Sequence, residues 1–298
     1  MDGILNINKA TGMTSHDVVT KIRKVAQQKR VGHAGTLDPA ASGVLPICLG
    51  QATRVAEYLS ESGKAYQAEI ILGVVTDTYD SEGIITRTST LTDLDRADIE
   101  QVIRQFLGPQ MQIPPPYSAI KIQGQTAYKR ARAGEAVVLP PRPINIYQLT
   151  ILQWLPHRLT LAIECSKGTY IRSLAYDLGE HLGGGAYLGA LIRTRSGPFS
   201  LSESSTLEQL EQAIAEGTVQ KHLHSPDKAL QHFPALVLDE ASVKHILHGN
   251  AFAYDDLPGH APSDLARVYD TSGRFLAIVK WDAERDMWQP KKVLLPYC

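Results

Sequence analysis

The chain has 298 residues, of which 43% are hydrophobic and 20% are charged, and its formal net charge is −1. These values are typical of an ordinary globular protein with room for one large domain and a smaller one. No apolar run approaches the roughly 18 residues that a membrane helix needs, and the first residues lack a secretion signal. We therefore expect a cytoplasmic protein with no membrane contact.

The charge is unevenly distributed along the chain. Residues 1–54 hold seven basic and three acidic side chains (net +4), and residues 107–200 hold ten and four (net +6). Residues 55–106 hold four and ten (net −6), and residues 201–298 hold nine and fourteen (net −5). The basic segments predict a face that binds nucleic-acid phosphates, with a merely solvated surface as the alternative. The three cysteines lie far apart, which argues against disulfides and a zinc site.

The first part of the chain predicts a strand and a helix. Residues 3–8 alternate as a short strand, and Thr14 or Ser15 caps the helix that follows. Lys9 lies in the turn between them. We interpret it as a solvated surface lysine, because lysine is seldom buried.

Residues 32–43, the Asp38 loop, read GHAGTLDPAASG. Glycines permit unusual backbone angles, Pro39 fixes its own φ, and a residue before proline is held extended. The segment therefore predicts a stiff loop that presents one carboxylate, Asp38. The alternative is an Asx turn in which Asp38 caps its own backbone.

The next elements alternate between scaffold and charged loop. Residues 44–49 predict a buried run, residues 52–59 a helix, and a strand begins near Tyr66. Three acids then share one loop: Asp77, Asp80 and Glu82. Their spacing lacks the length and the terminal glutamate of an EF-hand, so we expect no metal there.

After a helix at 95–107, the run PPPY at 114–117 predicts a rigid, extended segment. Cations interleaved with aromatic rings follow: Lys121, Lys129, Arg130, Arg132 and Arg142 with Tyr117, Tyr128 and Tyr147. Such a combination suits a folded RNA loop, because the cations meet phosphates and the rings stack on bases. The alternative is an exposed basic helix without a partner.

Residues 143–154 and 158–165 predict a hairpin, followed by a helix at 170–182. Arg172 lies in the first turn of that helix, where the dipole favours acids rather than cations. A specific anionic partner would explain this placement.

Four stretches resemble, in order and at similar spacing, the TruB family of bacterial tRNA pseudouridine-55 synthases. They are the Asp38 loop, KAY at 64–66, IPPPYSAIK at 113–121 and CSKGTYIR at 165–172. The resemblance covers about residues 3–200, with a weaker match at the C-terminus.

The resemblance implies an α/β chain of the α+β type with the pseudouridine-synthase fold, whose central sheet is mixed and mostly antiparallel. We expect this catalytic domain at 1–220, with an RNA-clamping insertion at about 110–142. A linker at 218–235 and a small PUA-like β-barrel at 236–298 complete the expected organisation.

The resemblance also implies roles for individual residues. Asp38 is the catalytic carboxylate, Arg172 keeps it ionised, and Tyr66 stacks on the target uracil and serves in proton transfer. His33 helps to displace the flipped base, and Leu191 borders the base pocket or is ordinary core. Further candidates for contact with substrate RNA are Tyr170, Lys9, Lys121, Lys129, Arg132 and Arg142.

The implied reaction isomerises uridine 55 in the T arm of tRNA. The nucleotide is extruded, its N1–C1′ bond is broken, and the base rejoins through C5. No cofactor and no protein partner are expected. Whether Asp38 bonds covalently or removes a sugar proton stays open. The rival interpretations are a tRNA-folding chaperone without chemistry and a hydrolase with Asp38 as nucleophile.

Overall fold

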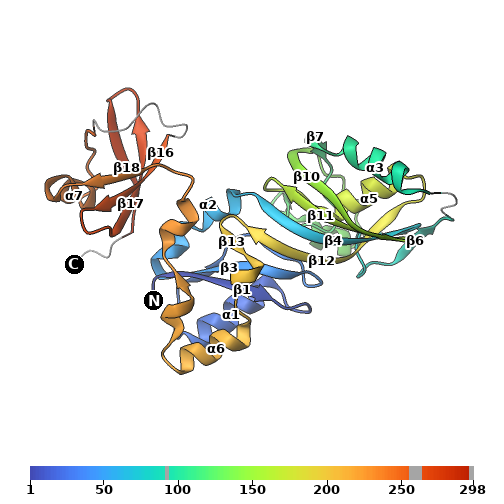
Figure 1. Ribbon diagram of the computed structural model, residues 1–298, viewed down its shortest axis with the longest axis horizontal. Helices are drawn as coiled ribbons and strands as arrows, with labels where there is room; N and C mark the ends of the chain where they lie inside the picture. The colour runs from blue at the N-terminus through green and yellow to red at the C-terminus, as the bar shows by residue number, and fades with distance from the viewer. Residues whose placement is uncertain (91–93, 255–263, 295–298) are drawn as a thin grey trace.

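The computed structural model describes residues 1–90, 94–254 and 264–294. They form an elongated molecule with a long sheet in the main body and a smaller sheet at one end (Figure 1). The order along the long sheet is β14 (Leu223–His224), β1 (Gly3–Lys9), β3 (Ser42–Leu49), β12 (Ala186–Ser196), β4 (Lys64–Leu72), β11 (Arg158–Cys165), β10 (Arg142–Leu155) and β7 (Gly108–Gln112), with β2 (Val31–His33) beside β3 and β13 (Phe199–Ser200) beside β12.

The pairs in this sheet are antiparallel except for β12 and β3, which run parallel. The mixed, mostly antiparallel sheet expected from the sequence is therefore confirmed. The parallel contact joins the half of the sheet that contains β1 and β3 to the half that contains β12, β4, β11 and β10. It sets Arg193 of β12 opposite Gly43 at the end of the Asp38 loop. A β-carbon at Gly43 would lie 2.3 Å from the Arg193 carbonyl oxygen, so only glycine permits this approach.

Helices cover both halves of the sheet. The elements of the first half are α1 (Ser15–Val25), the 3₁₀ turn η1 (Gly50–Arg54), α2 (Ala56–Glu61) and α6 (Leu207–Ala215). Those of the second half are α3 (Arg96–Gln105) and α5 (Ile171–His181), together with the small hairpin β5 (Val74–Thr76) and β6 (Ile85–Thr88). Of the two caps that the sequence offers for α1, Thr14 is the one used, and it forms a capping box with Asp17. Among the described residues, no helix is long and apolar enough to cross a membrane.

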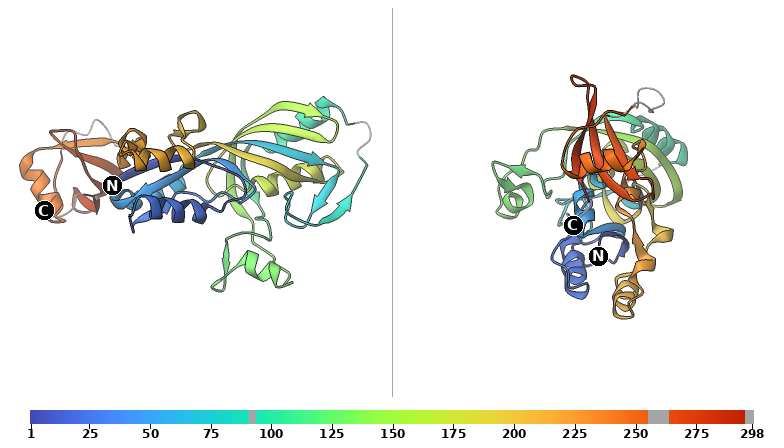
Figure 2. Two further views of the ribbon diagram at one scale, coloured as in Figure 1. Left: turned by 90° about the horizontal axis from the view of Figure 1, so that it is seen from below. Right: turned by 90° about the vertical axis from the view of Figure 1, so that its left-hand side faces the viewer.

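The segment between β7 and β10 leaves the body, and it lies within the stretch at about 110–142 for which an RNA-clamping insertion is predicted. It contains β8 (Lys121–Ile122), β9 (Gln125–Thr126) and α4 (Ala127–Arg132). Figure 2 shows it as a green arm that projects away from the sheet. Its cations are therefore presented on a separate lobe beside the body.

Residues 218–235, which we expected to be a linker, are folded against the main sheet. They contain η3 (Val219–His222), β14 and η4 (Pro226–Leu230), and follow η2 (Leu201–Glu203) and α6. In β14, His224 pairs with Ile4 of β1. Leu230 is fully buried with Ile4. The apolar residues of this segment pack against the sheet despite its two prolines, so the main sheet continues past residue 220. The domain boundary at residue 220 stays a prediction.

The C-terminal sheet has the order β15 (Ala235–Leu238), β16 (Leu265–Asp270), β17 (Phe275–Asp282) and β18 (Met287–Val293), with α7 (Glu240–Leu247) beside it. Strands are thus present within the unit expected at 236–298. The small barrel is a correction: the described residues form an open four-stranded sheet, and no strand closes it. Part of the predicted unit, residues 255–263 and 295–298, lies outside the described residues.

Candidate active site

A cavity of about 860 Å³ lies where the four sequence motifs meet. The Asp38 loop, β4, the acidic loop at 77–84, the insertion, the start of α5 and the strand β12 all line it. Its volume is in the range of ordinary ligand sites. The sheet order explains the convergence, because β3, β12, β4 and β11 are successive neighbours.

Asp38 stands on a loop that is anchored at both ends. Leu37 is buried, and its N–H donates to Ser15 Oγ at 2.9 Å. The Gly12 N–H donates to the Pro39 carbonyl oxygen at 2.9 Å. Among the described residues, the Asp38 carboxylate accepts no backbone hydrogen bond and pairs with Arg172 instead. Its geometry is that of a presented carboxylate rather than an Asx cap.

Lys9 is buried, so its interpretation as a solvated lysine is wrong. Its Nζ donates to the carbonyl oxygens of Ala10 (2.9 Å), Met13 (2.8 Å) and Pro39 (3.3 Å). Burial lowers its pKa to about 8. Lys9 thus ties the turn after β1 to the Asp38 loop, and its burial leaves no surface for contact with RNA.

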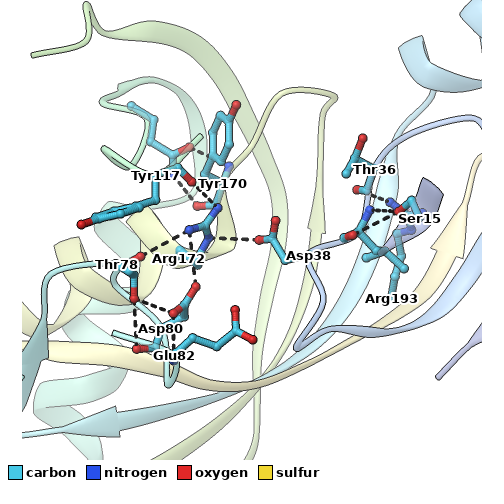
Figure 3. A network of polar contacts seen from close by, with 12 residues as sticks. Ser15, Thr36, Asp38, Thr78, Asp80, Glu82, Tyr117, Tyr170, Arg172 and Arg193 are labelled. Carbon is cyan, nitrogen blue, oxygen red and sulfur yellow. Dashed lines mark hydrogen bonds and ion pairs between the residues drawn. The ribbon is translucent and has the colours of Figure 1, made fainter. Parts of the chain in front are cut away.

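Arg172 occupies the centre of a polar network (Figure 3). Its Nε lies 3.1 Å from Asp38 Oδ2, and its Nη1 lies 3.4 Å from Asp80 Oδ2. Its remaining donors reach the carbonyl oxygens of Tyr117 at 3.0 Å and Thr78 at 3.4 Å. The anionic partner expected for this helix-start arginine is therefore present, and a second carboxylate joins it.

That second carboxylate, Asp80, is a site residue that sequence reasoning missed. It is buried, and its Oδ1 accepts from Thr78 Oγ1 at 2.6 Å and from the Glu82 N–H at 3.0 Å. Asp77 accepts from the Ile84 N–H and from the Tyr117 hydroxyl. These acids hold the loop in place, and Asp80 also holds Arg172. In the described part of the chain there is no group of three metal-ligating side chains.

Of the aromatic and apolar candidates, three lie in the cavity wall and His33 does not. Tyr66, Tyr170 and Leu191 all line it. Burial raises the pKa of Tyr66 to about 12 and also raises that of Tyr170. Tyr170 caps α5, and both its N–H and its carbonyl oxygen bond to the side chain of Gln112. His33 lies in β2 outside the lining, and burial lowers its pKa.

The candidate RNA-binding cations other than Lys9 are exposed. Lys121, Lys129 and Arg132 lie on the insertion and Arg142 begins β10. Arg132 also lines the cavity, with its guanidinium 5.9 Å from the centre of the Tyr128 ring. The arm and the cavity are therefore one continuous surface.

Two further lining residues, Lys64 and Arg193, were not singled out by sequence reasoning. Arg193 donates to the carbonyl oxygens of Val44 (2.7 Å), Gly35 (3.0 Å) and Thr36 (3.3 Å), and it interacts with the Tyr66 hydroxyl. The sequence contains the KAY motif at 64–66, but no local feature of the sequence indicates that the lysine of this motif is buried.

The chain matches two family models. The first is described as TruB family pseudouridylate synthase (N terminal domain) and covers residues 23–171, and the second as tRNA pseudouridylate synthase B C-terminal domain and covers residues 172–231. Over 295 residues the chain is 45% identical to tRNA pseudouridine synthase B of Dehalococcoides mccartyi, and the aligned region covers 99% of this chain and 97% of that protein.

The protein of the same name from Bacillus subtilis is 42% identical over 303 residues, with 99% and 98% covered. Among solved structures, a chain of a Cbf5-Nop10-Gar1 complex superposes with a TM-score of 0.76 at 29% identity, covering 99% of this chain and 85% of that one. The chain belongs to the TruB family of pseudouridine synthases.

Proposed function

We propose that the cavity around Asp38 isomerises uridine 55 in the T loop of tRNA, with Asp38 as the catalytic carboxylate. As a TruB-family enzyme, the protein converts uridine to pseudouridine in tRNA. The choice of the T arm, the residue roles, the independence from a protein partner and the cytoplasmic location belong to the proposal.

The observation that carries the proposal is the contact of Asp38 with Arg172 in the wall of the cavity. Breaking the N1–C1′ bond leaves positive charge at C1′, and a carboxylate beside it can stabilise or trap that charge. Asp38 is half-exposed and has one side-chain partner in the described residues, so its free oxygen faces the space that a nucleotide would enter.

The remaining lining suits an extruded base. Enzymes that act on a base must take it out of the stack and hold it in a pocket. Tyr66 and Tyr170 offer rings, Leu191 offers an apolar surface, and the exposed cations of the arm lie where the rest of a folded loop would pass. The reaction adds no atoms and changes no oxidation state, so it requires no cofactor.

The test compares the wild-type protein with Asp38→Asn on a T-arm stem-loop whose uridines carry tritium at C5. Asparagine keeps the shape of aspartate but not its charge. We expect tRNA affinity within a few-fold of wild type and a rate at least about a thousandfold lower, a barrier increase of roughly 4 kcal/mol. A stem-loop with cytidine at position 55 is the substrate control, and digestion locates the modified base.

Wild-type protein that binds the stem-loop without releasing tritium would favour the chaperone. Full activity of Asp38→Asn would instead remove Asp38 from the chemistry while leaving the activity itself intact.

A further inference from the structure

Two buried cations in the cavity wall have no carboxylate partner among the described residues. Lys64 is 7% exposed and Arg193 is 1% exposed. The Lys64 ammonium donates to the carbonyl oxygens of Ser60 (2.9 Å) and Ser62 (2.7 Å), which leaves one of its three N–H groups uncommitted. Arg193 spends three of its five N–H groups on backbone carbonyls.

The two charges converge on one place. A β-carbon at Gly35 would lie 3.5 Å from Lys64 Cε and 3.6 Å from Arg193 Nη1, so both side chains approach the Asp38 loop from the same side. Tyr66 lies on the same face of β4 as Lys64 and directly opposite Arg193 in β12. Burial and the nearby Arg193 lower the pKa of Lys64 to about 8.

Burying these two charges side by side costs free energy unless an anion binds beside them. A buried charge without a partner loses its hydration, and a second charge of the same sign nearby adds repulsion. Backbone carbonyls offset part of this cost by accepting hydrogen bonds, but they carry no net charge. An RNA phosphate is a poor candidate, because a backbone on the protein surface cannot reach side chains as deeply buried as these.

We propose that Lys64 and Arg193 stabilise the detached uracil as an anion during the reaction. This inference rests on the proposed use of the cavity as the base pocket. When the N1–C1′ bond breaks, its electron pair remains on the base and spreads over N1 and the two carbonyl oxygens, while C1′ becomes electron-poor beside Asp38.

The cations act only in this interval. The ring then attacks C1′ through C5, the C5 proton leaves, and N1 takes up a proton, so the base is neutral again and no atom is gained or lost. Fixed charges in a water-poor site favour a developing charge over the neutral ground state. Tyr66 shares a strand face with Lys64 and interacts with Arg193, so the same field acts on its hydroxyl.

The experiment replaces each charge separately in the full chain. Lys64→Met and Arg193→Met remove a charge, whereas Lys64→Arg and Arg193→Lys keep it. Arg195→Met is the matched control, because Arg195 lies two residues further along β12, outside the cavity lining, and pairs with Glu164 at 2.8 Å. The readout is single-turnover formation of pseudouridine in a T-arm stem-loop, together with affinity for that RNA.

We expect each neutral variant to lose on the order of a hundredfold in rate, which is the scale of removing one preorganised donor. Affinity should stay within a few-fold, the charge-keeping variants should recover most of the rate, and Arg195→Met should behave as wild type. If the charge-keeping variants are as slow as the neutral ones, the charge is not what matters and the inference fails.

A second substrate separates charge stabilisation from a structural role. Fluorine at C5 of the target uridine withdraws electrons and stabilises the base anion by itself, so a neutral variant should lose about tenfold less relative to wild type on this RNA. Fluorine cannot leave as a proton, so the reaction stops after rejoining, and the readout is disappearance of the parent nucleotide from digests.

Equal losses on uridine and on 5-fluorouridine would overturn the inference. If Lys64→Met fails to fold, Lys64→Gln takes its place, because the glutamine amide can still donate to Ser60 or Ser62. Its rates on uridine and on 5-fluorouridine are then compared in the same way. A failure of the proposed function would look different, because wild-type protein would then leave position 55 unchanged in both RNAs.

Discussion

Asp38 and Arg172 form an ion pair whose two members differ in their contact with water. Their side chains are 45% and 9% exposed, and Nε lies 3.1 Å from Oδ2. The guanidinium is held from behind by Asp80 and by the carbonyl oxygens of Thr78 and Tyr117. A pair that is open on one side contributes little to stability, but a rigid partner fixes the direction of the exposed carboxylate. The pair therefore serves orientation.

Replacing Arg172 should damage catalysis more than binding. Arg172→Met removes the partner of Asp38, so we expect turnover to fall by at least about a hundredfold while tRNA affinity changes only a few-fold. Arg172→Lys should restore part of the rate, because an ammonium keeps the charge but not the fixed fork of donors. Single-turnover rates and filter-binding affinities check this. Equal losses in affinity and turnover for both variants would identify Arg172 as an RNA contact.

Asp80 should act through Arg172 as a positioning residue. Asp80→Asn keeps an acceptor for Thr78 and for the Glu82 N–H but removes the charge that holds Arg172. We expect turnover to fall about tenfold or more at unchanged tRNA affinity. Asp77→Asn is the control in the same loop, because Asp77 accepts from Ile84 and Tyr117 and forms no ion pair with Arg172. Similar losses in the two variants would mean that the loop, rather than the charge, is what matters.

The sequence was sufficient where a signal is local. Alternating apolar residues and the turn between them predicted strands at 143–154 and 158–165, and the structure has them at Arg142–Leu155 and Arg158–Cys165. The helix-start argument about Arg172 also worked, because the misfit of a cation with a helix dipole is visible in one turn of sequence.

The sequence was insufficient where burial depends on partners from elsewhere in the chain. Lys9 is buried because three carbonyl oxygens converge on it, one of them from the Asp38 loop. Asp80 and Arg193 owe their places to contacts across the sheet and with α5. Residue type favours an exposed location for all three, and only the tertiary structure overrides it.

The exposed cations of the arm should set the salt dependence of binding. Replacing Lys121 and Lys129 together by glutamine removes two charges from the insertion. Each phosphate contact contributes roughly 0.7 to 0.9 to the slope of log affinity against log salt, so losing two contacts should make the slope shallower by up to about 1.4 to 1.8. Lys280, exposed on the C-terminal sheet, is the control whose replacement should change the slope less. An unchanged slope in the double variant would place the phosphates elsewhere.

The buried ammonium of Lys64 should make stability depend on pH in a defined direction. Its pKa is lowered from 10.5 to about 8 in the folded protein, chiefly by burial. Between these two values the unfolded chain binds more protons than the folded one, so stability increases as the pH rises. Below pH 8 the folded protein carries the full cost of the buried charge, about 3 kcal/mol at 1.36 kcal/mol per pKa unit.

Lys64→Met removes that cost at every pH. We therefore expect the difference in unfolding free energy between this variant and wild type to shift by about 2 kcal/mol in favour of wild type between pH 7 and 9.5, since most of the titration lies in that range. Urea unfolding at several pH values measures it, and Lys9 cancels because both proteins contain it. Lys21→Met, at an exposed position on α1, is the control. If the difference in unfolding free energy stays constant with pH, the buried charge of Lys64 does not destabilise the folded protein.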